Sequence, residues 1–177
     1  KEVLLFVHGY ANTFQDAAFS MADLCHFFGR EFVCAIFTWP AGGSRGLMAG
    51  YNVDRESGEF AVHHLKQALR LIAQSAGVER IHMMAHSRGT DVLASALREI
   101  NLEAYAAGTS IGARFKIKNI VLLAPDIDAF NRLFDIYCNC GAFTLSNRQS
   151  LGNNRSVEEE DTGGYLQMDW NTDFIGR

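Results

Sequence analysis

Ser87 is the residue whose surroundings most suggest chemistry. It lies in the stretch "IHMMAHSRGTDVL" at residues 81–93, which begins with apolar residues suited to a buried strand and continues with apolar residues at helical spacing. A sharp turn from strand to helix is therefore predicted at the serine. Ala85 and Gly89, two residues before and two after it, are small, so strand and helix can approach closely and leave the hydroxyl exposed. A serine in this position is typical of nucleophiles that attack a carbonyl carbon.

Apolar runs and helical spacing elsewhere predict the elements that would position this serine. Besides the serine strand, strands are predicted at residues 3–7, 32–39, 115–124, 135–138 and 165–170. Helices are predicted at 13–29, at 53–76, at 129–134 and directly after the serine, with loops at 41–50 and 147–164. Strands that alternate with helices imply right-handed crossovers. The predicted fold class is α/β, a three-layer sandwich with a mostly parallel sheet and helices on both faces.

Polar side chains follow four of the predicted strands. His8, Gly9 and Tyr10 follow the first strand, Trp39 ends the second, and Ser87 and Asp126 follow two later ones. Ligands of open parallel sheets bind beyond the carboxyl ends of the strands. We therefore expect these residues to gather at one edge of the sheet and to form the candidate site there.

Length, composition and charge limit the classes of function. A chain of 177 residues, of which 48% are hydrophobic, suits a single domain over residues 1–177 with a sizeable core. Lys and Arg total 16 against 20 Asp and Glu, which gives a net charge of −4, and no basic stripe is present, so nucleic acid and anionic membranes are poor partners. No apolar run approaches the roughly 20 residues that span a bilayer. We expect a soluble protein, with the cytoplasm favoured, although the sequence does not assign the compartment.

The four cysteines do not predict a disulfide framework in a chain of this length. We interpret Cys25, Cys34, Cys138 and Cys140 as mostly free thiols. Cys138 and Cys140 lack a second Cys or His pair at metal-ligand spacing, so a zinc site is not expected. The glycine-rich residues 41–50 lack the ending of a phosphate-binding loop. The sequence thus predicts neither a metal nor a cofactor.

Several strings together resemble the α/β-hydrolase superfamily. They are most like the small bacterial hydrolases without a cap domain that are grouped as domain of unknown function 900. The strings are "LLFVHGYANTFQDA", "FTWPAGG", "YNVDRESGEF", "RIHMMAHSRGTDVL" and "IVLLAPDID". The resemblance covers most of residues 3–150 and implies a minimal α/β-hydrolase core.

The resemblance also implies roles for particular residues. Ser87 would be the nucleophile, and the backbone N–H groups of Tyr10 and Arg88 would form the oxyanion hole. One such donor is typically worth about 3 kcal/mol of transition-state stabilisation. We expect His8 to brace its loop and His86 to point away from the serine. The Arg88 side chain would either contact a polar substrate group or be solvated at the helix start.

Two departures from the family pattern concern the acid and the base. Ala142, within "YCNCGAFTLSN", stands at the position of the family's catalytic aspartate. Asp126 or Asp128 could substitute for it, or these two could simply cap the turn after the preceding strand. No histidine follows His86, whereas the family's base lies near the C-terminus. Because residues 3–7 are already core-like and this histidine is missing, we expect the chain to be truncated at both ends.

The leading hypothesis is therefore a serine hydrolase that cleaves small carboxylic esters through an acyl-enzyme on Ser87. A lipase, a thioesterase or a peptidase of the same fold remains an alternative, because the nucleophile does not select the leaving group. The alternative from a different class is an inactive hydrolase fold that serves as a binding module. Ala142 and the missing histidine favour that alternative. The acyl group, the alcohol and the oligomeric state are not determined by the sequence.

Overall fold

The computed structural model describes most of the first 125 residues and two short segments after them. The described backbone comprises residues 1–41, 47–125, 145–146 and 165–169, and the described side chains belong to residues 1–41 and 57–125. The helix predicted at 129–134, the strand at 135–138 and the loop at 147–164 lie outside the described residues.

The described strands form one six-stranded sheet in the order β2-β1-β3-β4-β6-β5. The strands are β1 (Glu2–Val7), β2 (Val33–Phe37), β3 (Arg80–His86), β4 (Ile117–Leu123), β5 (Leu145–Ser146) and β6 (Tyr165–Asp169). The first four are parallel to one another, whereas β6 runs antiparallel to both β4 and β5. Val7 pairs with Phe37 on one side and with Ala85 on the other, so β1, β2 and β3 end at the same edge of the sheet.

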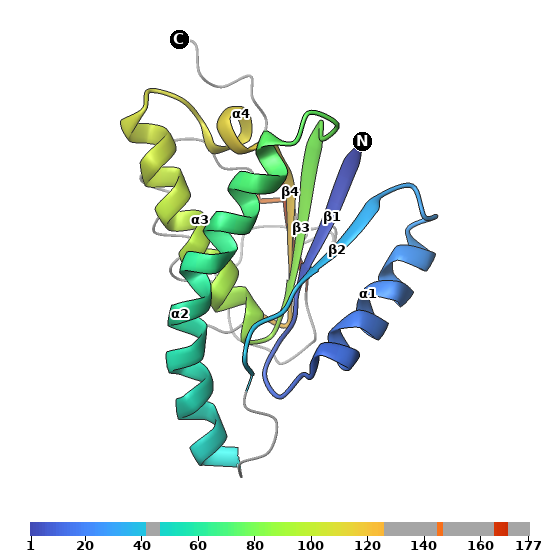
Figure 1. The fold of residues 1–177 in the computed structure, drawn as a ribbon, viewed down its shortest axis with the longest axis vertical. Helices are drawn as coiled ribbons and strands as arrows, with labels where there is room; N and C mark the ends of the chain where they lie inside the picture. Colours follow the sequence, from blue (N-terminus) through green and yellow to red (C-terminus); the bar gives the residue numbers. More distant parts are fainter. Residues whose placement is uncertain (42–46, 126–144, 147–164, 170–177) are drawn as a thin grey trace, which may run out of the picture.

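Helices lie on both faces of this sheet (Figure 1). They are α1 (Phe14–Phe27), α2 (Leu47–Gln74), α3 (Gly89–Ala106) and the short α4 (Ile111–Phe115). Helix α1 covers one face, and α2 and α3 cover the other (Figure 1). The predicted α/β three-layer architecture is confirmed, and the predicted last strand is present as β6. Two boundaries were wrong. Helix α2 begins at Leu47, inside the predicted loop at 41–50, and Phe115, predicted to begin a strand, is the last residue of α4.

The burial of β1 explains why its sequence is a continuous apolar run. Leu5 and Val7 belong to the large core beneath α2 and α3, whereas Leu4 and Phe6 belong to a smaller core on the α1 face. All four side chains are buried. A central parallel strand that is covered on both faces requires this pattern instead of alternation between apolar and polar residues. The strand is consequently anchored on both faces up to the residue before His8.

A capping box sets the start of α1 and hence the length of the loop that follows β1. The Thr13 hydroxyl accepts a hydrogen bond from the Asp16 backbone N–H at 3.2 Å, and the Thr13 backbone N–H donates to the Asp16 carboxylate at 2.8 Å. Hydrogen bonds from the Thr13 side chain and backbone hold the pKa of Asp16 below its ordinary value. The loop between β1 and α1 is therefore closed by local contacts at its far end.

Ion pairs connect α2 to α3 on the outside of the molecule. Arg70 donates two hydrogen bonds to the Glu103 carboxylate, both at 2.7 Å, and Lys66 lies 3.3 Å from the same carboxylate. The Arg70 hydrogen bonds, followed by those of Lys66, lower the pKa of Glu103. Lys66 also pairs with Glu99, which is the main cause of its raised pKa. These contacts help to hold α3, whose first turn follows Ser87, against its neighbour.

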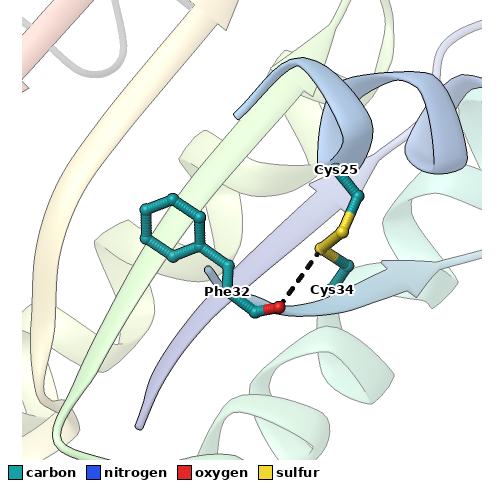
Figure 2. The surroundings of a disulfide bond; sticks show 3 residues. All are labelled: Cys25, Phe32 and Cys34. Atoms are coloured by element: carbon teal, nitrogen blue, oxygen red, sulfur yellow. Dashed lines mark hydrogen bonds between the residues drawn. A yellow bond between two sulfur atoms is a disulfide. The ribbon is translucent and has the colours of Figure 1, made fainter. Parts of the chain in front are cut away.

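A disulfide between Cys25 and Cys34 corrects, for these two residues, the prediction that the cysteines are mostly free thiols. It connects α1 to β2 across a sequence separation of 9 residues, with Cα atoms 6.1 Å apart (Figure 2). The short connection from α1 to β2 brings the two residues together, a tertiary effect that cysteine counting cannot detect. The Cys34 sulfur also lies 3.5 Å from the Phe32 carbonyl oxygen. Cys138 and Cys140 lie outside the described residues.

Candidate functional site

Ser87 lies at the predicted turn between β3 and α3. Its φ angle is 50°, which is in the left-handed region that residues other than glycine rarely adopt. Its backbone N–H donates to the Leu123 carbonyl of β4 at 2.9 Å. Its carbonyl oxygen accepts two hydrogen bonds from Thr90, from the backbone N–H at 2.9 Å and from the hydroxyl at 2.6 Å. These bonds hold a backbone conformation that costs about 1–3 kcal/mol and persists only where its surroundings enforce it.

Gly89 lets α3 begin in direct contact with the end of β1. A Cβ atom built on Gly89 would lie 2.3 Å from the His8 carbonyl oxygen and 2.7 Å from that of Val7. Both oxygens belong to the backbone, so no side-chain rotation could relieve the overlap. The small residue expected two positions after Ser87 is thus required by this close approach.

Gly9 brings the loop after β1 against Ser87. A Cβ atom on Gly9 would lie 2.9 Å from the His86 carbonyl oxygen and 3.0 Å from the Ser87 Cβ. Tyr10 follows directly, and Ala11 has a φ of 53°, so the chain turns sharply at this point. The register of β1 with β3 places His8 and Gly9 beside the end of the serine strand. The structure therefore brings the loop that carries Tyr10 next to Ser87, as the sequence predicted.

Hydrogen bonds between His8 and Trp39 fix the start of the loop that follows β1. The Trp39 backbone N–H donates to His8 Nε2 at 3.1 Å, and the Trp39 indole N–H donates to the His8 carbonyl oxygen at 2.9 Å. Because a backbone N–H can only donate, Nε2 must be the acceptor, and the proton on Nδ1 then points to the Gly9 carbonyl oxygen 3.0 Å away. The two rings are stacked with centroids 5.6 Å apart, and both residues are buried. His8 has the bracing contacts that were expected of it.

The structure contradicts one of the two roles predicted for the Arg88 side chain. Arg88 is buried, and its guanidinium lies 3.3 Å from the Asp91 carboxylate, whose side chain is also mostly buried. It is therefore not solvated at the helix start. Its backbone belongs to the N-terminus of α3, where the helix dipole favours negative charge. The neighbouring His86 is exposed.

The acid and the base expected from the family pattern are not placed by the structure. Asp126, Asp128 and Ala142 lie outside the described residues. Sequence reasoning put Trp39 at the correct edge but missed its two hydrogen bonds to His8, since nothing in a local pattern links residues 31 positions apart. Thr90 was also missed. A hydroxyl three residues after the candidate nucleophile, in the first turn of a helix, was the available signal.

In the part of the chain that the structure describes, no group of three or more His, Cys, Asp or Glu residues is placed to hold a metal ion. None of the helices within these same ranges combines the length and apolar character needed to cross a bilayer.

Comparison with known proteins gives one match. Residues 1–147 match the family described as "Alpha/beta hydrolase of unknown function (DUF900)". Searches of curated proteins and of solved structures each gave no match. The match covers most of the chain and includes β1 to β4 and the turn at Ser87. The chain therefore belongs to this family of α/β hydrolases of unknown function.

Proposed function

We propose that this α/β hydrolase cleaves carboxylic esters through an acyl-enzyme formed on Ser87. The observation that carries the proposal is the backbone of Ser87, which has a φ of 50° between a buried strand and a helix. Gly9 and Gly89 support it, because each leaves no room for a Cβ atom beside this turn. A strained serine turn of this kind exposes a nucleophile at the carboxyl edge of a sheet.

In the proposed reaction the Ser87 hydroxyl oxygen attacks the ester carbonyl carbon while a histidine takes its proton. Negative charge then develops on the former carbonyl oxygen, where backbone N–H groups of Tyr10 and Arg88 would stabilise it. The alcohol leaves with the proton from the histidine, and water repeats the sequence to release the acid. The family pattern puts this histidine after the nucleophile, but no histidine follows His86 in this sequence, so the base is not identified among these residues. Asp126 is the fallback for the acid, because Ala142 stands at the family's acid position.

Ester hydrolysis is proposed in preference to binding alone because the turn at Ser87 is maintained at a cost. Two hydrogen bonds from Thr90 and one to Leu123 hold the strained conformation. Strained backbone concentrates at functional sites. The same attack would serve a thioester, a lipid ester or a peptide, so the leaving group must be determined by assay.

Pre-steady-state hydrolysis of p-nitrophenyl acetate by the full-length protein tests the proposal. We expect a burst of nitrophenol close to one equivalent per active site, followed by slower turnover, as an acyl-enzyme requires. Ser87→Ala should abolish the burst, whereas Ser75→Ala, which changes an exposed serine at the far end of α2, should retain it. Equal bursts in wild type and Ser87→Ala would refute the assignment. A matched thioester and a peptide anilide measured in parallel would identify the preferred leaving group.

A further inference from the structure

A cavity of about 530 Å³ lies between the end of β2 and the middle of α2. Phe37, Trp39 and Pro40 line it from the strand end, and Phe60 and Ala61 line it from the helix. Among its described lining residues there is no Asp, Glu, Lys or Arg. Sites for small molecules usually have volumes of about 300–1,000 Å³ and mostly apolar walls. The space is therefore suited to an uncharged, apolar group.

Trp39 connects this cavity to the candidate site. Its backbone and its indole both bond to His8, directly before the glycine that contacts Ser87. On the α2 side, a Cβ atom built on Gly58 would lie 3.9 Å from the Trp39 ring and 3.5 Å from Val92 in the first turns of α3. Trp39 thus contacts both the bracing residue of the β1 loop and the helix wall of the cavity.

The sheet register sets the distance that a substrate would have to span. The end of β2 is separated from the end of β3 by β1 alone, and Val7 pairs with both Phe37 and Ala85. Neighbouring strands lie about 4.8 Å apart, so the cavity begins roughly 10 Å from the serine turn. Figure 1 shows α1 and α3 beginning at this same edge, whereas α2 starts beyond the edge and runs past it. An ester held at Ser87 could reach the cavity with a medium-length chain.

We propose that this cavity binds the apolar group of the ester substrate and that the enzyme therefore prefers esters with a medium-length hydrocarbon chain. The inference rests on the proposed function, since it places the ester bond at Ser87. The hydrocarbon can belong to the acid or to the alcohol, because the cavity recognises only its apolar surface. Burial of one methylene favours binding by about fourfold, so kcat/KM should rise with chain length until the cavity is filled.

Two variants change the cavity without touching the residues around Ser87. Ser57→Phe adds a ring to its wall and should fill part of it. Phe60→Ala removes an apolar wall, and because the Phe60 side chain is 78% exposed the fold should tolerate the change. Leu71→Ala is the matched control, since it removes an apolar side chain that is 69% exposed from the same helix but outside the cavity.

The kinetic test compares ethyl acetate with ethyl octanoate, which lengthens the acid, and with octyl acetate, which lengthens the alcohol. We expect the full-length wild-type protein and Leu71→Ala to have a higher kcat/KM for one of the two long esters than for ethyl acetate. Ser57→Phe and Phe60→Ala should reduce that preference at least about tenfold, mainly through the KM of the long ester, whereas Leu71→Ala should keep the wild-type preference. A preference that neither variant changes would overturn the proposal.

Binding of sodium octanoate and of octanol, measured by saturation-transfer NMR, separates failure of the cavity from failure of the reaction. If wild type binds either compound and Ser57→Phe weakens that binding, the proposed role of the cavity is supported. If no ester is cleaved in that case, only the proposed hydrolase function fails. Ester cleavage at Ser87 without any binding of octanoate or octanol refutes the proposed role of the cavity and leaves the proposed hydrolase function intact.

Discussion

Gly89→Ala would distinguish close packing at the serine turn from ordinary helix energetics. In an exposed helical position this change stabilises a protein by about 1 kcal/mol, because alanine has the higher helix propensity. At Gly89 the new Cβ would lie 2.3 Å from the His8 carbonyl oxygen and 2.7 Å from the Val7 carbonyl oxygen. The sign of the effect should therefore be reversed.

The size of this reversal follows from the displacement that the new methyl group requires. Ordinary Cβ contacts begin near 3.4 Å, so the His8 oxygen must move by about 1.1 Å relative to α3. Overpacking of a dense interior costs about 1–3 kcal/mol and occasionally more. The overlap here involves two backbone atoms, so we expect a loss near the upper end, about 3 kcal/mol. Ser87 and the β1 loop would separate, and acylation of the serine should fall at least a hundredfold.

Urea unfolding of Gly89→Ala measures the change in the free energy of unfolding, with Gly77→Ala as its control. No atom lies within 4 Å of a Cβ atom built on Gly77, so that variant should be neutral or stabilised by up to about 1 kcal/mol. Equal stability of the two variants would refute the packing argument. Loss of stability in Gly89→Ala with unchanged acylation would refute the link between this packing and the position of Ser87.

Three further predictions concern an ion pair between α2 and α3, the disulfide and a contact at the site. Glu103→Gln should lose about 0.5–1 kcal/mol at pH 7, because its partly exposed ion pair with Arg70 is screened by solvent. Because the pKa of Glu103 is lowered in the folded state, the ion pair stabilises the protein fully above the unfolded pKa, near 4.3, and this stabilisation is lost as the pH falls through the folded pKa. In urea unfolding at decreasing pH, the free energies of unfolding of wild type and Glu103→Gln should therefore converge. Reduction of the Cys25–Cys34 disulfide, which closes a sequence separation of 9 residues, should lower the free energy of unfolding by about 2.5 kcal/mol. The double serine variant should match the reduced wild type, and an unchanged midpoint on reduction would contradict the prediction. Trp39→Phe keeps a stacked ring but removes the indole N–H from a buried carbonyl, so it should cost about 1–3 kcal/mol of stability and lower kcat more than it raises KM. A change confined to the KM of ethyl acetate, which is too short to fill the cavity, would contradict a role of Trp39 in positioning the loop.

Local patterns were sufficient to predict the architecture and the turn at Ser87. The continuous apolar run of β1, buried on both faces, identifies a central strand, and the small residues around the serine are required by backbone contacts that the structure contains. The capping box at Thr13 was likewise detectable, since it depends on residues three positions apart.

The start of α2 and the disulfide could not be read from local patterns. Glycines at 42, 43 and 46 indicate a loop, but the helix begins directly after them at Leu47 and continues through Gly50, which costs about 1 kcal/mol that the rest of a long helix offsets. The Cys25–Cys34 pairing depends on where α1 and β2 lie in space. Long-range contacts of this kind arise from packing and leave no local signature.

The same reasoning explains which parts of the site were predicted. Each residue at the edge of the sheet is placed by its own strand, so the approach of the β1 loop to Ser87 follows from strand order alone. The hydrogen bonds between His8 and Trp39 and the ion pair between Arg88 and Asp91 require side-chain geometry. The sequence could therefore indicate the location of the site but not the contacts that hold it.

The central claim is that Ser87 is an activated nucleophile, and covalent labelling tests it most directly. The full-length protein would be treated with a fluorophosphonate probe beside Ser87→Ala, and the modified peptide identified by mass spectrometry. We predict stoichiometric labelling that is confined to Ser87 and absent from the variant. Folded wild-type protein that remains unlabelled, or a variant that is labelled equally well, would contradict the claim.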